Sequence, residues 1–170
     1  MGVAAGQRVY DPAAGSGGFL VAALDYVDGP EAGGFAESGI CGAEVSPQLG
    51  ALATINLMLR GACTRGLVPD SCFAHPQPGV STVLMNPPFS LRDSTESEAA
   101  FIDHALEQMR PNMGGLFAVI PSSVLYDQRH ASWRASLLTR HNLKAVILMP
   151  TDLFYPVATE TVVLVLGAGF

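Results

Sequence analysis

The amino-acid sequence predicts an α/β fold in which helices cover both faces of a seven-stranded, mostly parallel sheet. The first observation is that short apolar runs alternate with segments of helical periodicity through most of the chain. The second is the composition, with 49% hydrophobic and only 14% charged residues, which is typical of a sheet buried on both faces. The third is the short spacing of the last two strand-like runs, which leaves no room for a crossover helix, so the last strand should run antiparallel.

The expected strands are short apolar, β-branched runs bounded by turn-forming residues. They cover residues 8–11, 40–45, 67–70, 80–85, 116–120, 145–149 and 161–166. Pro69 lies within the third of these runs and cannot donate a ladder hydrogen bond, so that strand is expected at an edge of the sheet.

The expected helices show apolar residues at helical spacing. They cover about 16–27, 47–60, 101–109 and 132–140. Ser46 is a natural N-cap, Pro47 suits a first helical turn, and Gly61 is a natural end for the second helix. Residues 28–38 contain Gly29-Pro30 and Gly33-Gly34 and are expected to form a loop. Residues 90–97 are polar and are expected to form a mobile flap.

The length of 170 residues predicts one domain, covering 1–170, with a sizeable core. The chain has no apolar stretch near the roughly 18 residues of a membrane span and no basic-then-apolar N-terminus, so a cytoplasmic location is expected.

Cys41, Cys63 and Cys72 are not spaced as metal ligands usually are, and we expect reduced thiols and no metal. The formal net charge of −6 is the wrong sign for a surface that binds nucleic acid.

The segment Asn86-Pro87-Pro88-Phe89 directly follows the fourth strand. Its two prolines remove two backbone donors and fix two φ angles, so neither a strand nor a helix continues through them. We expect a rigid spur that presents an amide, a backbone carbonyl and an aromatic face. Asn-Pro pairs are also common in plain turns. The combination of a preceding strand, a second proline and Phe89 instead favours the binding of a flat, amino-bearing group such as a nucleobase.

A glycine-rich turn, residues 11–18, follows the first strand, and acidic residues end the next two strands. Glycines let the backbone approach a ligand, although Leu20 replaces the third glycine of a dinucleotide fingerprint. Glu44 could accept hydrogen bonds from a ribose and Asp70 from an adenine amino group, or either could be a solvated surface acid. These groups would meet the Asn86 spur if the strand order is 3-2-1-4-5-7-6.

Together, the runs Asp11–Leu20, Gly42–Pro47 and Asn86–Phe89 resemble the N6-adenine DNA methyltransferases, and most of all the modification subunit of type I restriction-modification systems. The resemblance covers nearly the whole chain, including 114–125 and 142–154, and the order of the motifs is that of the γ class. It implies a Rossmann-like class I S-adenosylmethionine-dependent methyltransferase fold. It also implies methyl transfer from S-adenosylmethionine to the N6 amino group of adenine in DNA.

The resemblance also assigns expected roles to single residues. The residues implied in cofactor binding are Asp11, Ala13, Gly15, Ser16, Gly17, Glu44, Asp70 and Asn86. The residues implied in catalysis are Asn86, Pro87, Pro88 and Phe89. Asn86 and the Pro87 carbonyl would accept the two protons of the target amino group, and Phe89 would stack on the base after it is flipped from the duplex.

The partners implied are DNA, a specificity subunit, a second modification subunit and a restriction subunit, with no membrane. This sequence differs from the family in having Ala14 where many relatives have cysteine, and it lacks the helices that flank the domain on both sides. We therefore expect a catalytic-domain fragment of a longer protein, with the phosphate-binding surface elsewhere.

Other functions remain open at this point. Asn-Pro-Pro-aromatic segments also occur in methyltransferases acting on a glutamine side chain or an RNA base. An inactive cofactor-binding module is a further alternative. The dispersed histidines, at positions 75, 104, 130 and 141, are expected in the core or on the surface rather than in catalysis.

Overall fold

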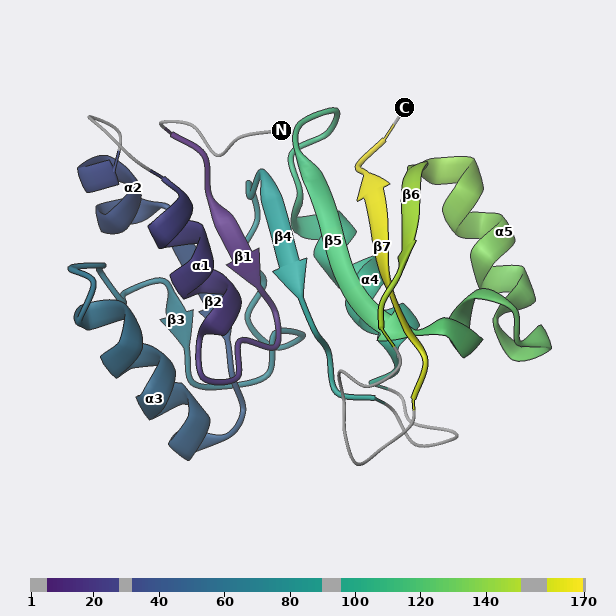
Figure 1. Ribbon diagram of the computed structural model, residues 1–170. Helices are drawn as coiled ribbons and strands as arrows, with labels where there is room; N and C mark the ends of the chain where they lie inside the picture. Colours follow the sequence, from purple (N-terminus) through teal and green to yellow (C-terminus); the bar gives the residue numbers. More distant parts are fainter. Residues whose placement is uncertain (1–5, 28–31, 90–95, 151–158, 170) are drawn as a thin grey trace.

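A single twisted sheet of seven strands organises the computed structural model, which describes residues 6–27, 32–89, 96–150 and 159–169 (Figure 1). The strands are β1 (Val9–Asp11), β2 (Ile40–Ala43), β3 (Leu67–Val68), β4 (Thr82–Met85), β5 (Gly115–Pro121), β6 (Asn142–Leu148) and β7 (Thr161–Gly167). The helices are α1 (Gly18–Tyr26), α2 (Ala32–Ser38), α3 (Pro47–Met58), α4 (Glu98–Gln108) and α5 (Ala131–Arg140), with two 3₁₀ turns, Ser122–Leu125 and Gln128–His130, before α5.

The strand order is β3-β2-β1-β4-β5-β7-β6, which confirms the predicted order. All pairs among β1 to β5 are parallel, and β7 runs antiparallel to both β5 and β6. The short connection between β6 and β7 explains this direction, because a parallel return would need a longer crossover. The Pro69 argument is also confirmed, since β3 lies at the edge of the sheet.

Two apolar clusters bury the two faces of the sheet, as the alternation of elements predicted. One face packs against α4 and α5, with Met85, Ile102 and Leu137 among its buried members. The other face packs against α1, α2 and α3 through residues such as Leu20 and Leu57. In Figure 1, α1 and α3 lie in front of the sheet and α4 lies behind it. None of the helices within the described ranges is long and apolar enough to cross a membrane.

The loop expected at residues 28–38 is a wrong prediction for residues 32–38, because helix α2 occupies Ala32–Ser38, and residues 28–31 lie outside the described residues. Its glycine pair is a poor helix former, but Phe35 is only 3% exposed and packs in the same cluster as Leu20. The backbone carbonyl of Ala36 also accepts a hydrogen bond from the Cys63 amide at 2.8 Å. Burial and these contacts outweigh the local preference. Residues 90–95 of the expected flap lie outside the described residues.

Candidate active site

A hollow of about 290 Å³ opens at the edge of the sheet where β1, β2 and β4 end. This is the edge at which doubly wound α/β folds bind their ligands, beside the point where the strand order reverses. The residues that line it are Pro12, Ala13, Gly15, Ala43, Glu44, Val45, Leu49, Ser71, Cys72, Asn86, Pro88, Glu96 and Phe101. The glycine turn, Glu44 and Asn86 therefore meet around one cavity.

The glycine turn is held in shape by backbone hydrogen bonds and by α3. The Ala14 amide donates to the Ala43 carbonyl at 2.9 Å, which ties the turn to β2. The Ser16 carbonyl accepts a hydrogen bond from Asn56 of α3 at 2.9 Å. Gly17, the N-cap of α1, has φ +84° and lies so close to Ala53 that an added Cβ would come within 3.2 Å of it. Only glycine combines this backbone angle with this contact.

Glu44 fastens the glycine turn to the start of α3. One of its carboxylate oxygens accepts a hydrogen bond from the Gly15 amide at 2.8 Å, and the other accepts one from the Ser46 amide at 2.8 Å. Each carboxylate oxygen still has a lone pair. Glu44 can therefore hold the turn and accept two further hydrogen bonds from a ligand's hydroxyls at the same time.

Asp11 lies under the glycine turn and is only 2% exposed. Its Oδ1 accepts a hydrogen bond from the Ala13 amide at 3.0 Å. Burial, and to a smaller extent the charge of Glu44, raises the pKa of Asp11 to about 7, although the Ala13 amide opposes the shift. A buried acid of this kind favours a nearby positive charge, which would restore its ionised form.

The Asn86–Phe89 spur borders the hollow from the β4 side. Asn86 and Pro88 line it, whereas Pro87 is buried and anchors the segment. Phe89 is 37% exposed, and it is not among the residues that line the hollow. The spur thus places Asn86 at the cavity, whereas the expected role of the Phe89 ring stays a prediction.

Asp70 differs from Glu44 and Asp11 because its carboxylate is paired with a side chain, that of His75. Its Oδ1 accepts a hydrogen bond from the Ser71 amide at 2.7 Å, and its Oδ2 lies 2.9 Å from His75 Nε2. The Ser71 amide and His75 hold the pKa of Asp70 below its usual range. Its side chain is exposed, and the next two residues, Ser71 and Cys72, line the hollow in its place.

Two residues of the α4 region line the hollow although their sequence gave no sign of it. Glu96 precedes α4 by two residues, and Phe101 belongs to its first turn. Phe101 packs against Phe73, with ring centroids 4.9 Å apart, and Phe73 contacts the edge of His104. His104 in turn lies 3.3 Å from the buried Tyr10 hydroxyl. The only available signal was the closeness of Glu96 to the Asn86 spur in the chain.

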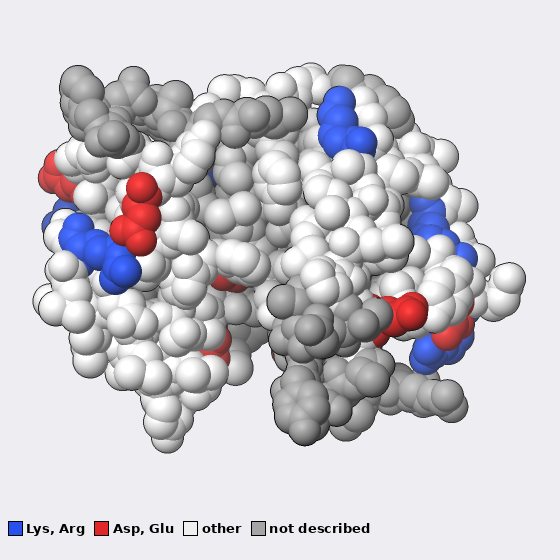
Figure 2. All heavy atoms as spheres, in the orientation of Figure 1, with Lys and Arg blue, Asp and Glu red and all other residues white. Residues whose placement is uncertain are grey.

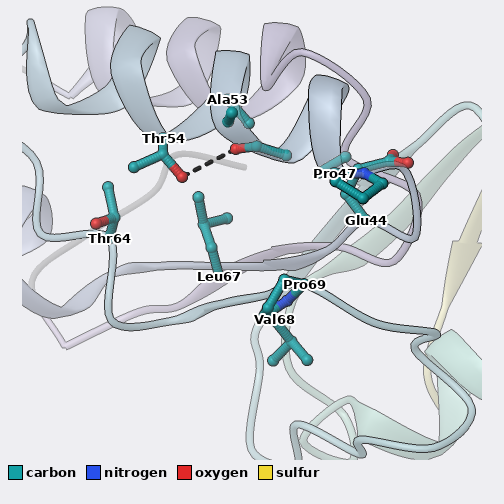
Figure 3. A pocket seen from close by; sticks show the side chains of 11 residues that line it. Glu44, Pro47, Ala53, Thr54, Thr64, Leu67, Val68 and Pro69 are labelled. Carbon is teal, nitrogen blue, oxygen red and sulfur yellow. Dashed lines mark hydrogen bonds between the residues drawn. The ribbon is translucent and has the colours of Figure 1, made fainter.

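A second hollow of about 280 Å³ lies between α3 and the β2–β3 edge (Figure 3). Its lining is mostly apolar, and the hydroxyl of Thr54 donates to the Gly50 carbonyl at 2.9 Å. Glu44 lines both hollows, but neither the spur nor the glycines of the turn reach this one. It therefore brings together fewer of the expected site residues than the first hollow.

The charge around the first hollow is negative. Glu44 and Glu96 line it, and the buried Asp11 accepts a hydrogen bond from Ala13, which also lines it. Figure 2 shows carboxylates in the recess between the α1–α3 half and the β5–β7 half. Within the described ranges, no group of three or more metal-ligating side chains could hold an ion. The electrostatics favour a positively charged ligand.

Comparison with known proteins gives consistent matches over almost all of the chain. The sequence profile of the family described as N-6 DNA Methylase matches residues 2–169. The type II restriction enzyme and methyltransferase RM.BcgI of Heyndrickxia coagulans is 31% identical over 185 residues, which cover 99% of this chain and 29% of that protein. The type I restriction enzyme EcoKI methylase subunit of Escherichia coli K12 is 27% identical, over 96% of this chain and 36% of that subunit.

Among solved structures, a modification subunit of a putative type I restriction enzyme from Vibrio vulnificus YJ016 superimposes with a TM-score of 0.84 at 26% identity. The match covers 96% of this chain and 40% of that one. The chain thus spans about a third of the length of the curated relatives it matches.

Proposed function

The chain belongs to the N-6 DNA methylase family, and from that premise we propose that it transfers a methyl group from S-adenosylmethionine to the N6 amino group of adenine in DNA. The observation that carries the proposal is the position of Asn86 and Pro88 in the wall of the same hollow as the glycine turn and Glu44. In this proposal, the glycine turn and Glu44 bind the methyl donor, and Asn86 binds the target amine in the same hollow.

The residues around the hollow fit S-adenosylmethionine. Glu44 has lone pairs available for two ribose hydroxyls, and the open backbone at Gly15 leaves room beside the turn, where an added Cβ would meet nothing within 4 Å. Asp11 and Glu96 suit a ligand that carries an ammonium and a sulfonium group. The cofactor supplies a methyl group that is already activated by a positively charged sulfur. Asp70 remains a proposed contact for the adenine amino group of the cofactor.

The chain's own part in the reaction is to orient and polarise the target amine. The side-chain oxygen of Asn86 would accept a hydrogen bond from one N6–H, and the backbone carbonyl of Pro87 would accept one from the other. This arrangement draws the nitrogen lone pair out of conjugation with the ring and directs it towards the hollow. Proximity and electrostatic stabilisation would account for most of the rate gain, because the methyl group of the donor is already activated, and the methylated amine would release its extra proton to water.

Phe89 holds the target base by stacking on its face after the base leaves the duplex. Stacking on an aromatic side chain contributes about 1–3 kcal/mol per base, and unstacking costs a few kcal/mol. Phe89 alone would thus offset only part of the cost of base flipping. We propose that a specificity subunit and a second modification subunit supply the remaining DNA contacts, in the manner of a type I methylase.

The test is a methyl-transfer assay with a radiolabelled donor and unmethylated DNA, RNA and protein offered as separate substrates, in the presence of the partner subunits. We expect label in DNA, at N6 of adenine, and its loss in the Asn86→Ala variant. Cofactor binding to the variant, measured by calorimetry, should remain within a few fold, which separates loss of catalysis from loss of folding. Label in RNA or on glutamine, and never in DNA, would contradict the proposal and favour one of the alternative substrates.

A further inference from the structure

We propose that Glu96 makes the hollow selective for a positively charged sulfonium cofactor over the neutral thioether that remains after methyl transfer. The inference rests on the proposed function and adds a residue, and a basis for product release, to the same site. It concerns binding specificity, and it assigns Glu96 no proton transfer.

The geometry places Glu96 on the wall of the hollow that belongs to the β4–α4 side. Glu96 lies ten residues beyond Asn86 in the chain and two before the first residue of α4. Asn86, Pro88 and Phe101, all of this side, line the same cavity. Glu44 comes from the end of β2, on the other side of the glycine turn.

The chemistry of the reaction puts the sulfonium near Glu96. The methyl group would have to face the amine held by Asn86, so the sulfur would lie towards the β4 side of the hollow. The ribose end lies towards Glu44, because that carboxylate has free lone pairs at the end of β2. Glu96 is thus the lining carboxylate on the side of the transferred methyl group.

The charge of Glu96 also affects Cys72, a buried residue that lines the same hollow. Burial raises the pKa of Cys72 to about 12, and the negative charges of Glu96 and Asp11 both contribute to the rise. Cys72 itself lines the hollow. Glu96 and Asp11 therefore act on one part of the cavity, and each disfavours negative and favours positive charge there.

The substrate cofactor carries one positive charge more than the product, at the sulfur. A carboxylate close to that atom binds the two ligands with different strength. Protein groups that contact the ribose, the adenine or the amino-acid part bind both ligands equally. Because Glu96 is exposed to solvent, screening limits the effect to about three- to tenfold in affinity.

The experiment is calorimetric titration of the chain with S-adenosylmethionine, with S-adenosylhomocysteine, and with an analogue that has an ammonium group in place of the sulfonium. In Glu96→Gln, we expect the Kd of both cationic ligands to rise about three- to tenfold and that of the neutral product to stay unchanged. Glu96→Asp keeps the charge and should keep most of the preference.

Two matched variants separate this role from general effects. Glu107→Gln makes the same change of charge on the exposed side of α4, outside the hollow, and should alter no affinity. Glu44→Gln should weaken all three ligands together, because the ribose is common to them. Thermal melting of each variant checks that the fold is retained.

Equal weakening of the cationic and neutral ligands by Glu96→Gln, or no weakening of either, would overturn the inference while leaving the proposed cofactor intact. A wild-type chain that binds none of the three ligands would contradict both the proposed cofactor and the inference.

Discussion

Glu44 and Asp70 each follow a strand in the same half of the sheet, yet their carboxylates have different neighbours. Glu44 lines the hollow, whereas Asp70 is exposed and paired with His75. We predict that Glu44→Ala weakens S-adenosylmethionine binding more than Asp70→Ala, because two charge-assisted bonds to a ribose exceed one to an amine. The loss for each of the two Glu44 bonds is about 1.5–3 kcal/mol, and calorimetry on both variants measures the comparison. Equal affinities in two folded variants would remove Glu44 from the site.

Asp11 gives a pH-dependent prediction. Burial raises its pKa from 3.8 to about 7, so the folded protein holds this proton more tightly than the unfolded chain. Between pH 4 and 7 the unfolded chain releases the proton first, and the contribution of Asp11 to stability falls as the pH rises. At about 1.4 kcal/mol per pKa unit, the penalty approaches roughly 4 kcal/mol above pH 7.

The Asp11→Asn variant removes this penalty. It should be close to the wild type in free energy of unfolding at pH 4 and increasingly more stable towards pH 8. Urea denaturation at pH 4, 6 and 8 measures the difference. A constant difference across this range would show that the ionisation of Asp11 does not affect folding.

At the scale of secondary structure, the junction between β1 and α1 depends on Gly17. Its φ of +84° and its contact with Ala53 of α3 disfavour any side chain there. We predict that Gly17→Ala lowers the free energy of unfolding by about 1–3 kcal/mol. Chemical denaturation measures this loss.

Gly18, the next residue, is the matched control. It is the first residue of α1, and an added Cβ would meet nothing within 4 Å. Gly18→Ala should leave stability unchanged or raise it by up to about 1 kcal/mol, because alanine is the better helix former. Similar losses in both variants would contradict the role given to the left-handed backbone of Gly17.

For the whole molecule, charge sets the expected behaviour towards DNA. Nine Lys and Arg residues stand against fifteen Asp and Glu, and Figure 2 shows the basic side chains scattered over the face drawn rather than gathered in a stripe. We predict weak duplex binding by the isolated chain, with a log–log salt slope no steeper than about −3, since each phosphate contact contributes about −0.9. Fluorescence anisotropy over a salt series measures it. A slope that corresponds to six or more phosphate contacts would place the DNA-binding surface on this chain.

Several features could be predicted from the sequence because short segments determine them. Periodicity and β-branched runs predicted all seven strands, and the short β6–β7 connection predicted the antiparallel β7. The glycine turn, the Ser46 cap and the Asn86 spur were predicted from backbone preferences that act within a few residues. The meeting of the turn, Glu44 and Asn86 followed from strand order alone, because parallel strands bring their carboxyl ends to one edge.

Other features depended on residues far apart in the chain, and only the tertiary structure decided them. Helix α2 forms against local preference because Phe35 is buried among residues of other elements. Strand β6 begins at Asn142, before its apolar run, because β7 supplies hydrogen-bonding partners from residues 161–167. Glu96 lines the hollow because α4 packs behind the sheet. The residue pattern within a segment indicates whether that segment prefers a helix, a strand or a turn. The burial and the direction of a side chain depend on residues that only the folded chain brings near.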